Sequence, residues 1–379
     1  MSNNKDLRKL TVSGLLISLG IIYGDIGTSP LYVFKAIVGT QHISETLILG
    51  GVSCIFWTLT LQTTLKYVVI TLRADNKGEG GIFSLFSLVR RRAKWLIIPA
   101  VIGGCALLAD GIITPPISVS AAIEGLQAYY PHLHTVPIVI SILIVLFIIQ
   151  QFGTSLVGKA FGPMMFIWFT MMGVLGILFV VQMPMVIKAL NPYYAYLILS
   201  TNPNAFIILG AVFLCTTGAE ALYSDLGHCG RRNIQISWIY VKTSLILNYL
   251  GQAVWLLQHN GTKLNLNLHN PFYEIMPPWF KLYGIGIATI ATVIASQALI
   301  SGSFTLIAEA VRLNLWPKVR INYPTIEKGQ LYVPSVNWLL CAGCVGVVLL
   351  FEHSDNMEAA YGLSITIAML MTTILVSNF

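Results

Sequence analysis

The stretch Gly20-Ile21-Ile22-Tyr23-Gly24-Asp25-Ile26-Gly27-Thr28-Ser29-Pro30 lies in the middle of an otherwise apolar segment, residues 12–37. A second apolar segment, residues 204–227, contains Thr216-Thr217-Gly218-Ala219-Glu220-Ala221-Leu222-Tyr223. Each stretch combines small and polar residues with one carboxylate. Irregular backbone at membrane depth is tolerated only where protein or a water-filled cavity satisfies its polar groups. The two stretches therefore predict two membrane helices that are interrupted near their middle.

The rest of the chain has the composition of a membrane protein. Of its 379 residues, 56% are apolar and only 10% are charged, whereas roughly 25% are charged in an ordinary soluble domain. A transmembrane helix needs roughly 20 residues, and apolar segments of about this length lie at residues 12–37, 47–72, 95–128, 136–152, 163–182, 204–227, 234–258, 283–309, 334–351 and 359–378. We predict an all-α membrane protein with about ten transmembrane helices, forming a single transmembrane core over residues 1–379.

Positive charge is distributed unevenly among the predicted loops. If the N-terminus is cytoplasmic, sixteen of the 22 basic residues lie in cytoplasmic loops: Lys5, Arg8, Lys9, Arg73, Lys77, Arg90, Arg91, Arg92, Lys94, Lys159, Arg231, Arg232, Arg312, Lys318, Arg320 and Lys328. The opposite loops contain only Lys35, Lys188, Lys263 and Lys281. The positive-inside rule then predicts a cytoplasmic N-terminus. Because the net charge of +7 reflects topology, we expect a lipid bilayer and no nucleic acid as partner.

The two interrupted segments are the first and the sixth of the ten. Spans that are five apart run in opposite directions through the membrane. Paired discontinuous helices of this kind indicate an inverted repeat that binds substrate and coupling ion near the bilayer midplane. We predict an inverted five-plus-five repeat, with repeat one at about residues 12–182 and repeat two at about residues 204–378. The alternative is that two glycine kinks merely ease helix packing.

Only three of the fifteen acidic residues lie deep in predicted spans: Asp25, Asp110 and Glu220. A carboxylate at the bilayer centre costs about 2.5–3.5 kcal/mol, so such residues are functional by default. We expect no Lys or Arg at their depth, because Lys66 and Lys242 lie closer to the span ends. Carboxylates without a fixed counter-charge either stay protonated or hold a cation. The pattern thus favours a proton-coupled cation carrier and argues against an anionic substrate.

Hydroxyl groups accompany Asp110 in its predicted span. Thr114 and Ser118 follow at spacings of four and eight, which place them on nearly the same helix face, about 6 Å and 12 Å along the axis. Carbonyl and hydroxyl oxygens are the ligands that potassium filters use. The alternative for the hydroxyls is that they bond back to their own helix, as most Ser and Thr in spans do.

Other conspicuous residues are expected to have structural roles. Cys341 and Cys344 form half a zinc motif without a second Cys/His pair nearby, so we interpret them as packing residues and expect no transition metal. Glu124, Asp225 and Glu309 lie near span ends, where we expect them to face loops or pair with basic residues.

Several strings together resemble one known family, the KUP (HAK/KT) potassium-uptake permeases. They extend from one end of the chain to the other and are Tyr23-Gly24-Asp25-Ile26-Gly27-Thr28-Ser29-Pro30-Leu31-Tyr32, Arg73-Ala74-Asp75-Asn76-Lys77-Gly78-Glu79-Gly80-Gly81, Ile113-Thr114-Pro115-Pro116-Ile117-Ser118-Val119, Thr217-Gly218-Ala219-Glu220-Ala221-Leu222-Tyr223 and Ala360-Tyr361-Gly362.

The resemblance implies a leucine-transporter type of core (APC superfamily), proton-coupled potassium symport, and homodimers in the plasma membrane, here the bacterial inner membrane. It implies ion-site roles for Asp25, Tyr32, Asp110, Thr114, Ser118, Thr217, Glu220 and Tyr361. K⁺ would bind at these residues, and no cofactor is expected beyond the transported K⁺ and H⁺. Asp110 stands where many bacterial members have Glu. The family has twelve spans and a cytoplasmic domain, so this sequence is expected to lack the C-terminal spans and that domain.

These observations lead to one functional hypothesis, a symporter that imports potassium by alternating access. An amino-acid or polyamine carrier of the same fold remains an alternative only for cationic substrates, because the first break contains Asp25. A passive cation channel is a further alternative. We expect no enzyme activity, because no nucleophile with a matched His and acid lies in the predicted spans.

Overall fold

The computed structural model describes residues 10–76, 79–152, 155–265, 268–324 and 331–379. In these residues the regular structure is helical apart from two isolated β-bridges, Asn76 to Glu79 and Asn322 to Tyr332. The α-helices are α1 (Val12–Ile21), α2 (Gly24–Thr28), α3 (Val33–Val38), α4 (Glu45–Thr58), α5 (Ile82–Val89), α6 (Ile97–Glu124), α7 (Thr135–Ile149), α8 (Ser155–Val180), α9 (Pro192–Thr201), α10 (Ala205–Phe213), α11 (Ala221–Ser224), α12 (Leu226–Cys229), α13 (Arg231–Gln258), α14 (Pro271–Glu274), α15 (Pro278–Arg312), α16 (Pro334–Phe351) and α17 (Ser354–Ser377).

Most of the predicted spans are present as long apolar helices. In the described part of the chain, eight helices are long and apolar enough to cross a membrane, or nine if the bent pair at the N-terminus forms one span. The predicted span 234–258 lies within α13, which has 28 residues but is not among them. Arg231, Arg232, Lys242, Asn248 and Gln252 lower the hydropathy of this helix. α13 packs along α8 in the bundle.

The first predicted interruption is confirmed. α1 and the segment Gly24–Leu31 form one bent pair, with an angle of 68° between its parts. Gly24 lies at the bend, where a Cβ atom would come within 2.7 Å of the Ala295 Cα atom on α15. A glycine is needed here because the backbones of two helices approach so closely.

The second predicted interruption is confirmed as well. α10 ends at Phe213, and the chain resumes an α-helix only at Ala221, the first residue of α11. Thr217 has ψ 141° and Gly218 has φ +73°, a left-handed conformation that a Cβ atom disfavours. These two residues turn the backbone out of the α-helix, although the Thr217 amide still donates to the Leu214 carbonyl over 3.4 Å and the Gly218 carbonyl still accepts from the Ala221 amide over 3.1 Å.

α6 remains one helix although it contains Pro115 and Pro116. A proline leaves the carbonyl four residues earlier without its helical donor. For Pro115 that carbonyl belongs to Gly111, and the Cys344 thiol of α16 donates to it over 3.8 Å. Cys344 therefore has a packing and hydrogen-bonding role, as its position in an apolar segment suggested.

One span has an unusual backbone. α4 continues as a π-helix over Leu59–Ile70, a form that normally occurs only as single turns, often at functional sites. The hydroxyls of Thr64 and Thr71 each donate to the carbonyl five residues earlier, over 3.1 Å and 2.8 Å. The π-helix sets the direction in which Lys66 and Tyr67 project.

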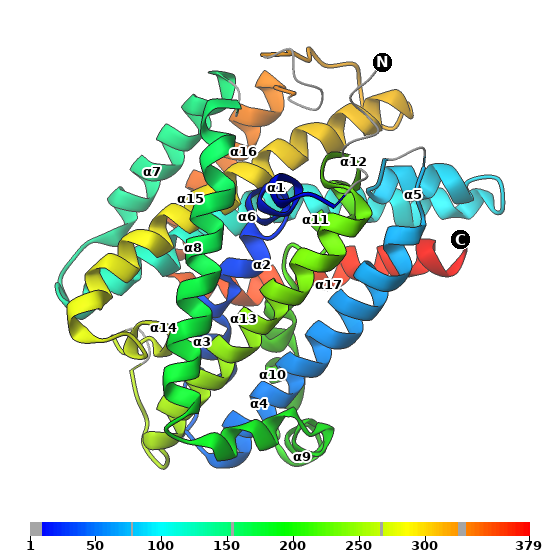
Figure 1. Ribbon diagram of the computed structural model, residues 1–379. Coiled ribbons are helices and arrows are strands. Elements are labelled where there is room, and N and C mark those ends of the chain that lie inside the picture. The colour runs from blue at the N-terminus through cyan, green and yellow to red at the C-terminus, as the bar shows by residue number, and fades with distance from the viewer. Residues whose placement is uncertain (1–9, 77–78, 153–154, 266–267, 325–330) are drawn as a thin grey trace.

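The loops separate by charge as predicted, as far as the described residues extend. Figure 1 places α5 and α12, with the basic segments beside them, at the end of the molecule that carries the N mark, and α9 and α14 at the opposite end. Arg92, next to α5, donates to the carbonyl of Phe379 over 2.7 Å, so the last helix also ends on that side. Of the predicted cytoplasmic residues, Lys5, Arg8, Lys9, Lys77 and Lys328 lie outside the described residues.

Candidate functional site

The two interrupted helices meet at their breaks. A Cβ atom on Gly218 would lie 2.8 Å from the Asp25 Cβ atom, so the two segments are in direct contact. The hydroxyls of Ser29 and Thr217 are 2.7 Å apart, and the Tyr32 hydroxyl lies 3.5 Å from that of Thr217. All of these side chains are buried. The breaks thus form a polar region inside an apolar bundle.

α6 and α17 complete this polar region. The Thr114 hydroxyl donates to Asp110 Oδ1 over 2.7 Å and lies 2.7 Å from the Tyr361 hydroxyl. Tyr361 in turn donates to Asp25 Oδ2 over 3.5 Å. Tyr361 therefore connects the carboxylates of two different helices through one hydroxyl group and Thr114.

The hydroxyls of Thr114 and Ser118 on α6 contact other side chains rather than the backbone of their own helix. Ser118 lies 3.4 Å from the Thr28 hydroxyl, which donates to the Asp25 carbonyl over 2.9 Å. Thr114 donates to the carboxylate of Asp110 rather than to a backbone carbonyl. The alternative that these two hydroxyls merely bond back to the helix backbone is wrong for this structure.

A cavity of about 70 Å³ joins the three predicted carboxylates. Asp25, Asp110 and Glu220 all line it, together with Gly218 at the second break. From there its wall continues along α15 to Leu306 and reaches Asp225 beyond α11. The cavity therefore extends from the breaks toward the end of the molecule that carries α5 and α12.

Glu220 has two neighbours that we did not expect. The Tyr67 hydroxyl donates to Glu220 Oε1 over 3.2 Å. Lys66 donates to the Met369 carbonyl over 2.7 Å, lies 4.7 Å from the centre of the Tyr67 ring, and interacts electrostatically with Glu220. We expected no Lys or Arg at the depth of the three acids, but Lys66 lies beside Tyr67, whose hydroxyl contacts Glu220. Lys66 lies in the π-helical segment Leu59–Ile70, next to Tyr67. Its position near the end of a predicted span did not suggest this proximity to Glu220.

All eight predicted site residues belong to this region, through the contacts above or through the cavity wall. Four further residues were missed: Thr28, Ser29, Lys66 and Tyr67. The signal for Thr28 and Ser29 was available, because both lie in the quoted first stretch. For Lys66 and Tyr67 the only signal was a basic and an aromatic residue side by side in an apolar segment.

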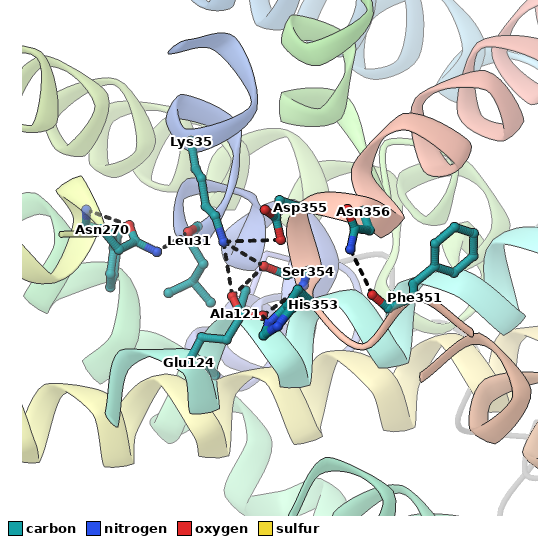
Figure 2. A network of polar contacts seen from close by, with 12 residues as sticks. Leu31, Lys35, Ala121, Glu124, Asn270, Phe351, His353, Ser354, Asp355 and Asn356 are labelled. Atoms are coloured by element: carbon teal, nitrogen blue, oxygen red, sulfur yellow. Dashed lines mark hydrogen bonds and ion pairs between the residues drawn. The ribbon is translucent and has the colours of Figure 1, made fainter. Parts of the chain in front are cut away.

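A second polar network lies on the other side of the breaks (Figure 2). Lys35, in the middle of α3, donates to Glu124 Oε2 and to the Ser354 hydroxyl, each over 3.2 Å. Glu124 also accepts from the Ser354 amide over 2.8 Å and from its hydroxyl over 2.6 Å. Asp355 Oδ1 lies 3.8 Å from the Lys35 ammonium. The expected pairing of Glu124 with a basic residue is confirmed, but the pair is buried rather than loop-facing.

The chemistry of the first region is that of a site for a small cation. It offers carboxylate, hydroxyl and carbonyl oxygens, the hard ligands that suit alkali-metal ions. Within the described residues, no group of three or more His, Cys, Asp or Glu side chains has the geometry of a metal site. The oxygens of this region come instead from the two breaks, α6 and α17, so a bound ion would be shared among four elements.

Fold and site together define a multi-pass integral membrane protein with acidic and hydroxyl groups gathered between two interrupted helices. A sequence profile described as the K⁺ potassium transporter integral membrane domain matches residues 12–379. The chain belongs to this family of potassium transporters, as the resemblance of its motifs predicted.

Curated relatives support this assignment. A protein of Flavobacterium psychrophilum is 66% identical over 383 residues, one of Cytophaga hutchinsonii is 63% identical over 383 residues, and one of Clostridium perfringens is 55% identical over 397 residues. Each covers the whole of this chain, and each is named "Probable potassium transport system protein Kup". These names denote transport proteins rather than enzymes. The chain spans 59%, 58% and 60% of the lengths of the three relatives.

Proposed function

We propose that this chain contains the core of a potassium importer that couples K⁺ uptake to H⁺ movement. The observation that carries the proposal is the gathering of Asp25, Asp110 and Glu220 on one cavity, beside the hydroxyls of Thr114 and Thr217. Three carboxylates attract a cation, and hydroxyl and carbonyl oxygens replace part of its hydration shell. The printed names of the relatives point to the same ion.

Alternating access is the proposed mode of transport. The two interrupted helices run in opposite directions, since α1 starts at the end with the N mark and α10 starts beside α9 at the opposite end (Figure 1). This arrangement supports an inverted five-plus-five repeat of the leucine-transporter type. The cavity reaches from the carboxylates to Asp225, which supports release of the ion on the side of α5 and α12. We propose that this side is the cytoplasm and that the protein lies in the bacterial inner membrane.

Proton coupling would use one of the three carboxylates. One carboxyl group would hold the co-transported proton in its neutral form while the other carboxylates hold K⁺, so that both ions are loaded before the carrier changes conformation. Asp25 and Glu220 are the preferred carriers, because each lies at a break. We also propose, from the family resemblance, that the full protein forms homodimers, which native mass spectrometry in lipid nanodiscs would test.

Rubidium uptake into liposomes tests the proposal. We expect the purified protein to take up rubidium faster when an inward proton gradient is applied, and Asp25→Asn, Asp110→Asn and Glu220→Gln each to abolish this uptake. Glu45→Gln, at an exposed position on α4, is the matched control and should transport normally.

Three results would contradict the proposal. A flux that ignores the proton gradient would favour a passive channel. Competition by polyamines or cationic amino acids would favour a carrier of organic cations. Normal uptake by all three carboxylate variants would remove the site assignment.

A further inference from the structure

The polar network around Lys35 lies on the opposite side of the breaks from the cavity. Glu124 is ten residues beyond Thr114 on α6, about 15 Å along the axis. Ser354 is seven residues before Tyr361 on α17, about 10 Å along the axis. The cavity instead extends toward Asp225 and Leu306. If an ion leaves through the cavity, the network lies where an ion would arrive.

Glu358 connects this network with the ion site. It lies one turn beyond Ser354 on α17 and three residues before Tyr361. Its side chain is 6% exposed, and its Oε1 atom has no hydrogen-bond partner in the described residues. Ser354, one turn earlier on the same helix, contacts both Lys35 and Glu124. No step of the proposed transport cycle described above uses this carboxylate.

The charges of the network do not balance. The carboxylates of Glu124 and Asp355 lie 3.2 Å and 3.8 Å from the ammonium group of Lys35, and a third carboxyl group, that of Glu358, follows one turn along α17. Excess charge in a low-dielectric interior is costly, so a buried carboxylate attracts a cation or a proton. Among the described residues, the other basic group that faces the network is His353, whose Nδ1 lies 3.8 Å from Glu124 Oε1 and whose side chain is 48% exposed.

Lys35 belongs to a much shorter helix than its partners do. α3 contains only six residues, Val33–Val38, and ends at Gly39, which has φ +51°. Glu124 and Ser354 belong to helices of 28 and 24 residues. A shift of α3 would withdraw the ammonium group and leave the oxygens of Glu124 and Ser354 in place.

We infer that Glu124, Ser354 and Glu358 form an outer binding site for a monovalent cation, which Lys35 fills with its own ammonium group when the path on this side is closed. The inference rests on the proposed function, since it assigns a place on the path of the transported ion. The donors are carboxylate and hydroxyl oxygens, the same types as at the inner site. An arriving alkali-metal ion would replace the ammonium group and then pass Glu358 on its way to Tyr361.

The kinetics of rubidium uptake in liposomes test this site, with rubidium added on the side of Lys35. Glu358→Gln should raise the KM for rubidium about tenfold and change the maximum rate less than about twofold, because one charge that attracts the ion is lost while the inner site remains. Lys35→Met should lower the KM several-fold, because it removes the tethered competitor. Opposite shifts of KM would not arise from a purely structural role of the network.

The matched control is Glu352→Gln, an exposed acid at the same end of the molecule, which should leave KM unchanged. Glu358→Asp retains the charge, and we expect it to transport with a KM between those of the wild type and Glu358→Gln. An unchanged KM in Glu358→Gln, or a KM in Glu358→Asp as high as in Glu358→Gln, would overturn the inference and leave the proposed function intact. Absence of rubidium uptake by the wild type would overturn both.

Discussion

The hydroxyl of Tyr361 is the point at which carboxylates from two helices become connected. It lies 2.7 Å from the Thr114 hydroxyl and donates to Asp25 over 3.5 Å. We predict that Tyr361→Phe raises the KM for rubidium by about tenfold or more, because hydrogen bonds to charged groups contribute about 1.5–3 kcal/mol. Uptake by the variant in liposomes, at equal protein amounts, measures the effect.

A second tyrosine provides the control for this change. Tyr249 on α13 is also buried, but its hydroxyl has no hydrogen-bond partner in the described residues. Tyr249→Phe removes the same atom and should leave uptake unchanged. Equal effects of both substitutions would mean that Tyr361 acts through packing and not through its hydroxyl.

His353 gives the outer network a pH dependence. Interaction with the Glu124 carboxylate raises the pKa of the His353 imidazole above its ordinary value. A raised pKa in the folded state stabilises the protein fully below the unfolded value of about 6.5, and the contribution is lost as the pH rises through the raised pKa. Glu124 pairs with Lys35 as well, so the network retains one positive group at high pH.

We therefore predict that His353→Gln lowers the melting temperature in detergent at pH 6 and has no effect at pH 9. The contribution should be less than about 1 kcal/mol, because the side chain is half-exposed and solvent screens the pair. His132→Gln, at an exposed loop position, is the control. An equal loss at both pH values would contradict the assigned ion pair.

At the residue scale, the sequence predicted the acids better than their partners. Asp25, Asp110 and Glu220 stood out because a carboxylate within a membrane span is energetically costly and is therefore usually functional. The contacts of Lys35 and Lys66 could not be predicted, because both join residues that are about 300 positions apart in the chain. The spacing of residues along the sequence does not indicate which distant residues come into contact when the helices pack.

At the scale of the element, the two breaks depend on glycines in different ways. Gly218 adopts φ +73° and lies against Asp25. We predict that Gly218→Ala reduces rubidium uptake about tenfold or more, since a left-handed conformation costs an L-residue about 1–2 kcal/mol and the added Cβ would displace Asp25.

Gly210, in α10 of the same interrupted span, is the matched control. A Cβ atom there would meet no other atom within 4 Å, and alanine favours a helix over glycine. Gly210→Ala should transport at the rate of the wild type. If both substitutions were tolerated, the break would not need the left-handed residue.

The breaks could be predicted from composition, because a cluster of small and polar residues around an acid is costly in a continuous helix that faces lipid. The π-helix of Leu59–Ile70 could not, since its residues are ordinary for a span and only tertiary contacts select the wider turn. α13 shows the opposite case. Its pattern predicted a span, but its polar residues place it below the hydropathy of a clear membrane helix.

At the scale of the whole molecule, the distribution of basic residues predicts the orientation. Five of the six native cysteines are buried, so a Cys105→Ser background permits labelling of single introduced cysteines. We predict that Lys263→Cys reacts with a membrane-impermeant maleimide in intact spheroplasts. Arg91→Cys, near α5 at the other end, should react only after the membrane is opened. The reverse pattern would overturn the proposed cytoplasmic N-terminus.

The fold class and the gathering of the eight site residues were predictable because the chain is nearly all membrane helix. A carboxylate in such a helix has to face the interior of the bundle rather than lipid. The inverted repeat and its boundaries at residues 12–182 and 204–378 stay predictions. They require a relation between two halves, which neither composition nor individual contacts establish.

The π-helical stretch makes the second long span sensitive to its exact residue count. Converting Leu59–Ile70 to an ordinary α-helix would rotate every later side chain of the span about the helix axis. Lys66 and Tyr67 would then point away from Met369 and Glu220. Loss of a single residue, even at exposed Leu61, would therefore disturb the ion site at a distance. Substitutions on the exposed side of this span should therefore disturb the ion site less than the deletion of one residue from it.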